Sequence, residues 1–257
     1  MTQIPRRMVL TRLATAPFVA KLTGLNRPAS AQTGPEIVSV RTPSGRSVSG
    51  VVAVPLTDPA PAVLLIHGIS GLTDWVKVFT GHFARDGFFA LALDLFDGRT
   101  ATDDAGRAVL VNEANSNPAK AAETIIAWIE WLKADRRTNG KVGVVGWSFG
   151  ARWALEASIN TPVEATVVYV GLVQRGAKDL ARLKGPVMLH LAERDHDVSK
   201  SDVEWFEKTM VEAGESVEVH WYPGDHYFPF PNFPSYDKEL ADAAWARTTQ
   251  FLHTNLK

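Results

Sequence analysis

The chain has 257 residues, of which 46% are hydrophobic and 21% are charged, a composition that can bury one substantial core. The formal net charge of -1 offers no basic surface for a phosphate backbone, so nucleic acid is not an expected partner. Cysteine is absent, which excludes disulfides, thiolate metal sites and a cysteine nucleophile. No stretch approaches the roughly 20 apolar residues of a spanning helix, so no membrane is expected as a partner of the mature protein.

The first 31 residues differ from the rest because they contain basic side chains but no acidic one. The pair Arg6-Arg7 precedes a weakly apolar run, and the segment ends in Ala29-Ser30-Ala31, where small residues favour signal peptidase cleavage. We therefore predict a twin-arginine export signal over residues 1–31, periplasmic localisation, and a single domain over residues 32–257. A mitochondrial transit peptide and an uncleaved cytoplasmic extension are the alternatives.

Short runs of β-branched residues alternate with segments of helical period for most of the chain. This alternation predicts an α/β fold with a mostly parallel central sheet and helices on both faces. Pro43-Ser44-Gly45 joins the first two runs, which we expect to form an antiparallel hairpin at one edge. Strands are expected at 36–40, 47–54, 62–66, 88–93, 141–145, 165–170, 186–191 and 216–222, and helices near 122–132, 151–158, 203–210 and 240–252.

Gly146-Trp147-Ser148-Phe149-Gly150 fits a Gly-x-Ser-x-Gly motif, and it lies between the strand expected at 141–145 and the helix expected at 151–158. The glycines permit a tight, strained turn that brings neighbouring chain close and lifts the serine hydroxyl above the sheet. A chance Gly/Ser turn is the alternative. The position between a buried strand and a helix favours Ser148 as a nucleophile.

A serine hydroxyl needs a base that takes its proton, and the base needs a carboxylate that fixes its tautomer. His226 follows the last expected strand, and Asp195 follows the strand before it, so both are expected beside Ser148 at the carboxyl ends of the strands. Asp197 is the nearest rival acid, and Asp225 is a weaker one. We predict a triad of Ser148, Asp195 and His226.

The turn His67-Gly68-Ile69 follows the strand expected at 62–66, and a backbone N–H of this turn is expected to point at the nucleophile. The N–H of Phe149 would be the second donor of an oxyanion hole. We interpret His67 as a hydrogen-bonding residue of the turn and not as a base. No spacing of His, Asp or Glu resembles a metal-ligand set, so neither a metal nor a cofactor is expected.

Five motifs between about residue 62 and residue 252 carry a family resemblance. They are Leu65-Ile66-His67-Gly68-Ile69, Ala92-Leu93-Asp94-Leu95-Phe96, Gly143-Val144-Val145-Gly146-Trp147-Ser148, Ala192-Glu193-Arg194-Asp195 and Asp225-His226-Tyr227. In these motifs the chain resembles the dienelactone hydrolase family of the α/β-hydrolases. The resemblance implies an α/β-hydrolase fold without a large cap domain, the same triad, and Ile69 and Phe149 as the oxyanion donors.

The chain departs from the family at several positions. Well-known members have a cysteine nucleophile and a glutamate after the third strand, where this chain has Ser148 and Gly68. They also place an arginine after the catalytic histidine to hold a substrate carboxylate, whereas Tyr227-Phe228-Pro229-Phe230 follows His226 here. We therefore expect neutral or apolar small esters and lactones, with Tyr227 and Phe228 as substrate-binding residues. Arg99 is the candidate that would instead favour an anionic substrate.

The site is expected to be open, because only about 15 residues separate the strand ending at 170 from the one starting at 186. Its walls are expected from a Gly/Asp/Asn-rich loop over 97–118 and an aromatic loop over 227–236. The predicted function is hydrolysis of a small-molecule ester or lactone through an acyl-enzyme. Thioester or peptide cleavage on the same triad and a non-catalytic binding protein on this fold are the alternatives.

Overall fold

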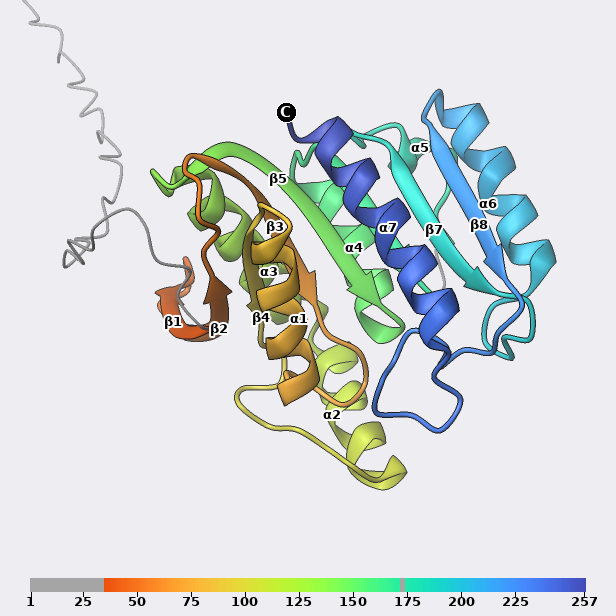
Figure 1. Cartoon of the computed structure of the whole chain (residues 1–257), viewed down its shortest axis with the longest axis horizontal. Coiled ribbons are helices and arrows are strands. Elements are labelled where there is room, and N and C mark those ends of the chain that lie inside the picture. Colours follow the sequence, from red (N-terminus) through yellow and green to blue (C-terminus); the bar gives the residue numbers. More distant parts are fainter. Residues whose placement is uncertain (1–34, 172–173) are drawn as a thin grey trace, which may run out of the picture.

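One sheet of eight strands forms the centre of the molecule, as a computed structural model that describes residues 35–171 and 174–257 shows (Figure 1). Its strand order is β1-β2-β4-β3-β5-β6-β7-β8. The strands from β3 to β8 run parallel, whereas β1 and β2 form an antiparallel hairpin at one edge. The strands are β1 (Glu36–Arg41), β2 (Ser47–Ala53), β3 (Ala60–Ile66), β4 (Phe89–Leu93), β5 (Thr138–Trp147), β6 (Ala165–Tyr169), β7 (Val187–Ala192) and β8 (Val217–Tyr222).

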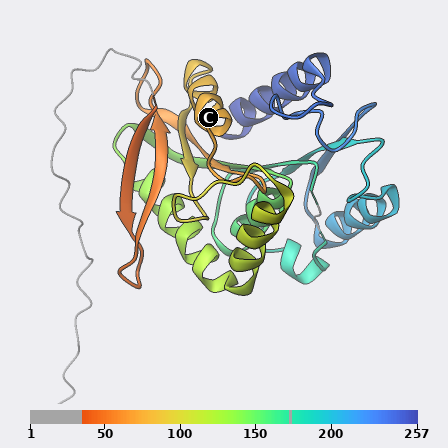
Figure 2. The same ribbon diagram turned by 90° about the horizontal axis from the view of Figure 1, so that it is seen from below.

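Helices cover both faces of this sheet. Helices α1 and α7 lie on one face, and α3, α4 and α6 lie on the other (Figure 2). No helix in the described ranges is long and apolar enough to span a bilayer. The helices are α1 (Asp74–Arg85), α2 (Asp104–Ser116), α3 (Pro118–Ala134), α4 (Phe149–Asn160), α5 (Ala177–Leu180), α6 (Lys200–Ala213) and α7 (Lys238–Asn255).

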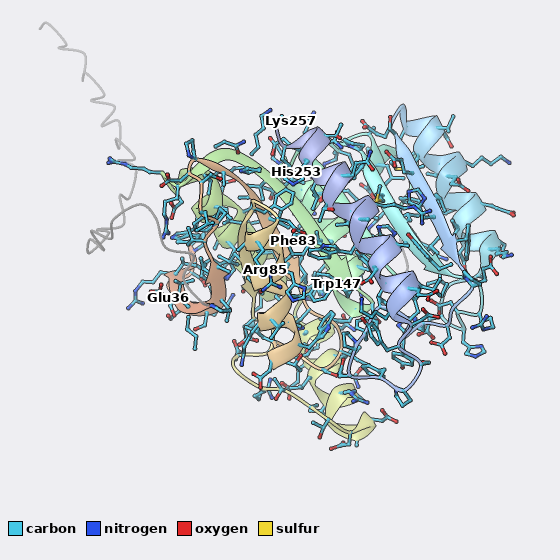
Figure 3. All side chains as sticks on the ribbon, viewed as in Figure 1. Glu36, Phe83, Arg85, Trp147, His253 and Lys257 are labelled. Carbon is cyan, nitrogen blue, oxygen red and sulfur yellow. The ribbon has the colours of Figure 1, made fainter. Side chains whose placement is uncertain are left out.

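The central strands are buried on both sides, as the alternation of strands and helices requires. Every residue of β4 and of β6 is buried. Aromatic rings tie the two helices of one face together, because the ring of Phe88 lies 6.0 Å from that of Phe83 on α1 and 4.3 Å from that of His253 on α7 (Figure 3). Phe88, which directly precedes β4, therefore packs against both helices of this face.

The expected fold class is confirmed, and each expected strand overlaps an observed one. The expectation of a loop over 97–118 is wrong, because most of this segment forms α2, whose N-cap Asp103 accepts a hydrogen bond from the Gly106 N–H at 2.8 Å. Leu110 is the one buried residue that the helix contributes, so its sequence lacks an apolar stripe. The predicted export signal over 1–31 lies outside the described residues.

Candidate active site

The loop between β5 and α4 holds Ser148 in a rare backbone conformation, with φ 51° and ψ -112°. The flanking glycines allow this turn because there is no space for a side chain. A Cβ on Gly146 would lie 2.2 Å from the Gly150 carbonyl oxygen, and one on Gly150 would lie 2.2 Å from that of Ile66. The turn therefore presents the serine hydroxyl at the N-terminus of α4 and at the carboxyl end of the sheet.

Three side chains from three separate loops meet at this point. The hydroxyl oxygen of Ser148 lies 2.9 Å from His226 Nε2. On the other side of the ring, Nδ1 lies 3.1 and 3.0 Å from the two carboxylate oxygens of Asp195. The structure thus brings together the serine, the histidine and the acid expected from the sequence, in an unbroken hydrogen-bonded chain.

Asp195 is better placed than its rival Asp197. Its side chain is 1% exposed, whereas that of Asp197 is 73% exposed and approaches His226 Nδ1 only to 3.8 Å. Burial raises the pKa of the Asp195 carboxyl, but hydrogen bonds from His226 and from the backbone of Asp197 and Val198 outweigh it and hold the pKa below its ordinary value. The buried carboxylate stays ionised and keeps the Nδ1 proton of the histidine directed toward itself.

Two backbone N–H groups beside Ser148 suit an oxyanion hole. Gly68 and Gly71 are the ends of a tight turn in which the Gly71 N–H donates to the Gly68 carbonyl at 3.2 Å, and Ile69 is the second residue of this turn. Phe149 is the first residue of α4, where the helix dipole is positive. Neither the Ile69 N–H nor the Phe149 N–H donates to another group within residues 35–171 and 174–257. Both donors are available to a ligand.

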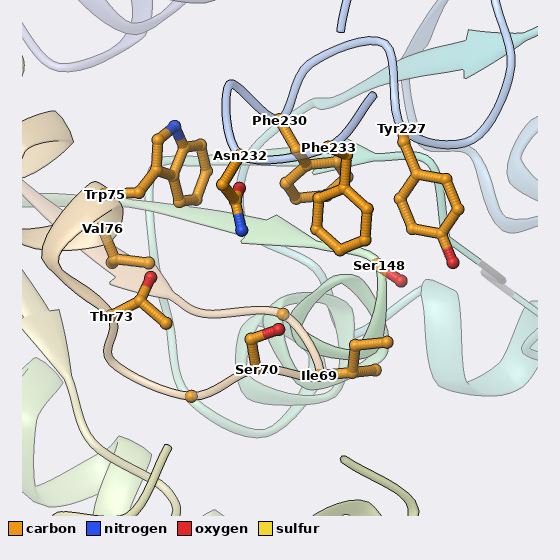
Figure 4. A pocket seen from close by; sticks show the side chains of 12 residues that line it. Ile69, Ser70, Thr73, Trp75, Val76, Ser148, Tyr227, Phe230, Asn232 and Phe233 are labelled. Carbon is orange, nitrogen blue, oxygen red and sulfur yellow. The ribbon is translucent and has the colours of Figure 1, made fainter. Parts of the chain in front are cut away.

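A hollow of about 370 Å³, open to solvent, lies in front of Ser148 (Figure 4). Ile69 of the Gly68–Gly71 turn forms one side of it, and the rings of Tyr227, Phe230 and Phe233 form another. The rings of Tyr227 and Phe233 stack at 4.2 Å between centroids. The lining beside Ser148 is therefore mainly apolar and aromatic, which suits an acyl or aryl group.

Two of the three residues expected to bind substrate lie elsewhere. Phe228 is fully buried and stacks on Tyr222 at 5.0 Å, so it anchors the aromatic loop and does not reach the hollow. Arg99 forms an ion pair with Glu113 of α2 and lines a second, more polar hollow behind that helix. Tyr227 does line the hollow at Ser148.

The start of α1 contributes a wall that was not expected. Thr73, Trp75 and Val76 line the hollow on the side remote from Ser148 (Figure 4). The signal was present in the sequence, since Trp75, Phe79 and Phe83 recur every four residues, a spacing typical of one apolar helix face.

Arg107 of α2 is a further residue near the site. Its Nε donates to the Ser70 hydroxyl at 3.2 Å, and its guanidinium lies 5.4 Å from the centre of the Phe233 ring. The side chain is 18% exposed and pairs with Asp104 at 2.8 Å. Arg107 thus joins the Gly68–Gly71 turn to the aromatic loop, a contact that no local sequence pattern indicates.

One cluster of potential metal ligands occurs in the described part of the chain. Ligand atoms of Asp195, Asp197 and His226 lie within 4.8 Å of one another. Two of these residues already form the hydrogen-bonded chain to Ser148, and their separation matches that of a histidine and its orienting acid. The arrangement can therefore transfer protons to and from the serine without a metal ion.

Comparison with known proteins identifies the family. The model of the dienelactone hydrolase family matches residues 48–256. Carboxymethylenebutenolidase 1 of Cupriavidus pinatubonensis is 24% identical over 84% of this chain and 95% of that protein, and protein usf of Aquifex pyrophilus is 31% identical over 81% and 94%. A solved dienelactone hydrolase-like promiscuous phosphotriesterase from metagenomic libraries has a TM-score of 0.78 at 20% identity, covering 88% of this chain and all of that one. The chain therefore belongs to the dienelactone hydrolase family and is a carboxylic ester hydrolase.

Proposed function

We propose that the protein cleaves small esters or lactones through an acyl-enzyme on Ser148. His226 Nε2 takes the serine proton as the oxygen attacks the substrate carbonyl carbon, and the N–H groups of Ile69 and Phe149 stabilise the oxyanion. The imidazolium, stabilised by Asp195, then gives the proton to the leaving oxygen. Water activated by the same histidine cleaves the acyl-enzyme, releases the acid and regenerates the serine.

The observation that carries this proposal is the hydrogen-bonded chain that opens on an apolar hollow. Ser148 lies 2.9 Å from a histidine whose other nitrogen contacts a carboxylate with 1% exposure. A serine with no base beside it is a poor nucleophile at neutral pH, so both contacts are needed for chemistry. A protein that only bound ligands would not need these two hydrogen bonds between serine, histidine and carboxylate.

The test is covalent labelling of the wild-type protein with a fluorophosphonate probe, followed by peptide mass spectrometry. We expect one probe per chain on Ser148 and a burst of p-nitrophenol with activated esters. A panel of lactones, esters, thioesters and peptide amides then separates the acyl-transfer reactions that share this triad. A folded wild-type protein that neither reacts with the probe nor hydrolyses the panel would show a non-catalytic binding protein.

The lining of the hollow supports neutral or apolar substrates over substrates that carry a carboxylate. A carboxylate against the rings of Tyr227, Phe230 and Phe233 would lose water without gaining a hydrogen bond. Arg99 pairs with Glu113, Arg107 pairs with Asp104, and neither side chain lines the hollow at Ser148, so no guanidinium there replaces that water. Relatives named carboxymethylenebutenolidase act on a carboxylate-bearing lactone by name, so we place this chain apart from them in substrate preference.

A matched pair of aryl acetates tests this preference. The specificity constant for 4-acetoxybenzamide is expected to exceed that for 4-acetoxybenzoate, which differs only by its free carboxylate. Arg107→Leu and Arg99→Ala should leave that order unchanged. A preference for the carboxylate ester that disappears in either variant would overturn the proposal.

We also propose export through a twin-arginine signal, with cleavage after Ala31. The acid-free segment over 1–31, its arginine pair and its Ala-x-Ala end support this assignment. N-terminal sequencing of protein isolated from the native host is expected to start at Gln32. A start at Met1 or Thr2 in the cytoplasmic fraction would contradict it.

A further inference from the structure

His67 is a buried polar residue that the mechanism above does not use. Its side chain has no exposed surface. The Leu95 N–H donates to Nε2 at 3.1 Å, and Nδ1 lies 2.8 Å from the carbonyl oxygen of Gly68. Because a backbone N–H is only a donor, Nε2 must be the acceptor and Nδ1 must carry the proton. The tautomer is therefore fixed, and Nδ1–H donates to the Gly68 carbonyl.

This hydrogen bond sets the direction of the next N–H in the chain. The Gly68–Ile69 peptide bond is trans, so the Gly68 carbonyl and the Ile69 N–H point in opposite directions. The carbonyl is held against the His67 ring and by the Gly71 N–H on the same turn. The Ile69 N–H must therefore point away from the histidine, and Ile69 lines the hollow together with Ser148 (Figure 4).

The ring of His67 also lies beside Phe149, whose N–H is the second proposed oxyanion donor. The rings of His67 and Phe149 are nearly parallel, with 6.4 Å between centroids, and Phe96 packs edge-on to His67 at 4.6 Å. The histidine thus lies beside both segments that supply the proposed oxyanion donors. Burial is the main cause that lowers its pKa, which favours the neutral, singly protonated ring that this geometry requires.

We propose that His67 is a positioning residue that aims the Ile69 N–H at the oxyanion of the reaction, acting through the Gly68 carbonyl. This inference rests on the proposed serine-hydrolase function. It goes beyond a turn-stabilising role because it assigns the two ring nitrogens different tasks. The Nδ1–H bond orients the donor, whereas the Nε2 bond joins the turn to the loop after β4.

Two substitutions separate these tasks. His67→Asn places an amide N–H near the position of Nδ1 and keeps a donor for the Gly68 carbonyl. His67→Gln places its amide near the position of Nε2, so it keeps an acceptor for the Leu95 N–H but loses the first bond. Phe96→Leu is the matched control, because it removes a ring contact from His67 and leaves both hydrogen bonds in place.

Steady-state kinetics on p-nitrophenyl butyrate give the main readout. In His67→Gln we expect kcat to fall about 30-fold with KM within about twofold, since complete loss of one oxyanion donor costs about 10²- to 10³-fold. His67→Asn and Phe96→Leu should keep kcat within about fivefold. The inhibition constant of a trifluoromethyl ketone, whose adduct carries an oxyanion, should rise in His67→Gln in parallel with the fall in kcat.

The proposal would be overturned if kcat in His67→Gln were equal to or higher than kcat in His67→Asn. A change in KM alone would also overturn it. If the variants do not fold, the wild type still tests the donor that His67 is proposed to aim, and without that donor the proposal fails. The Ile69 amide proton should move downfield when the ketone adduct forms, and an unchanged resonance would refute its role as a donor. Failure of the wild type to react with a fluorophosphonate would instead refute the proposed function.

Discussion

His226, which follows β8, and His190 on β7 show how different surroundings give the same kind of side chain different roles. Each has both ring nitrogens in hydrogen bonds. His226 lies between a carboxylate and the hydroxyl of Ser148, which lines the hollow. His190, on β7, lies between the hydroxyl of Tyr222 at 2.8 Å and that of Thr248 on α7 at 2.9 Å, with no exposed surface.

The difference lies in the partners and in the access of solvent. A carboxylate stabilises an imidazolium, which is what the proposed mechanism requires of His226. His190 has only neutral hydroxyl partners, and burial, followed by the charges of His220 and Arg247, holds its pKa well below the ordinary value. It stays neutral and joins α7 to β7 and β8. Hydrogen bonds at both ring nitrogens therefore do not by themselves indicate a catalytic histidine, and the buried carboxylate partner is what distinguishes His226 from His190.

The largest loss of activity is expected from removing the side chains of Ser148 or His226. Ser148→Ala or His226→Ala should lower kcat/KM for ester hydrolysis by about 10⁴-fold or more, because the two act as a unit. The midpoint of thermal unfolding should change little, since neither side chain contributes much to packing. Ester assays and calorimetry on the same preparations measure both. Substantial activity in Ser148→Ala would refute the nucleophile assignment.

The next contrast compares the two neighbouring acids. Asp195→Asn should lower kcat by about 10⁴-fold, because an amide no longer selects the required histidine tautomer. Asp197→Asn is the matched control and should cost less than about tenfold, since its carboxylate is 73% exposed and lies 3.8 Å from Nδ1. Equal damage from the two variants, measured under saturating ester, would mean that both acids orient the ring.

At His190 the expected effect is on stability rather than on chemistry. His190→Ala should lower the free energy of unfolding by about 3 kcal/mol, because it leaves a cavity and removes one hydrogen bond each from the hydroxyls of Tyr222 and Thr248, which keep Arg247 and Tyr169 as partners. The kcat of the protein that remains folded should stay within about threefold. His196→Ala, an exposed control, should change the free energy by less than about 0.5 kcal/mol. Urea denaturation distinguishes the two, and an unstable control would void the comparison.

The smallest expected effect is the dependence of stability on pH. The folded-state pKa of His190 lies below its unfolded value, so below about pH 6.5 the unfolded chain binds a proton that the folded chain does not. Its contribution to stability is therefore complete above that pH and is lost as the pH falls, by at most about 1.4 kcal/mol per pH unit. His67 acts in the same direction. His190→Gln should flatten the slope between pH 7 and pH 5, and an unchanged slope would contradict this origin.

The strands and the tight turn around Ser148 could be predicted because their sequence signals are local. Buried parallel strands are apolar runs, and the glycines at 146 and 150 have no space for a Cβ. The order of Ser148, Asp195 and His226 along the chain then agreed with strand ends that meet at one edge. These features depend on neighbours in sequence or on the general topology of parallel sheets.

Contacts between helices and loops could not be predicted in the same way. Arg99 was expected near the substrate, but Glu113 on a helix without an apolar stripe captures it. Phe228 lies in an aromatic loop, and only the packing on Tyr222 shows which rings of that loop turn inward. Arg107 is near the site because α2 places it between two loops that are more than 150 residues apart in the sequence. Such contacts are set by tertiary packing.

The three side chains of the proposed triad come from segments that lie far apart in the sequence. Ser148 and His226 are 78 positions apart, and the helix that packs beneath the histidine loop, α7, ends only at Asn255. During refolding we expect the turn at Ser148 to form early from β5 and α4. We expect His226 to reach Ser148 only when β8 and α7 have docked. Recovery of esterase activity should therefore trail recovery of helical circular dichroism, and a chain that stops before α7 should contain the serine without its reactivity.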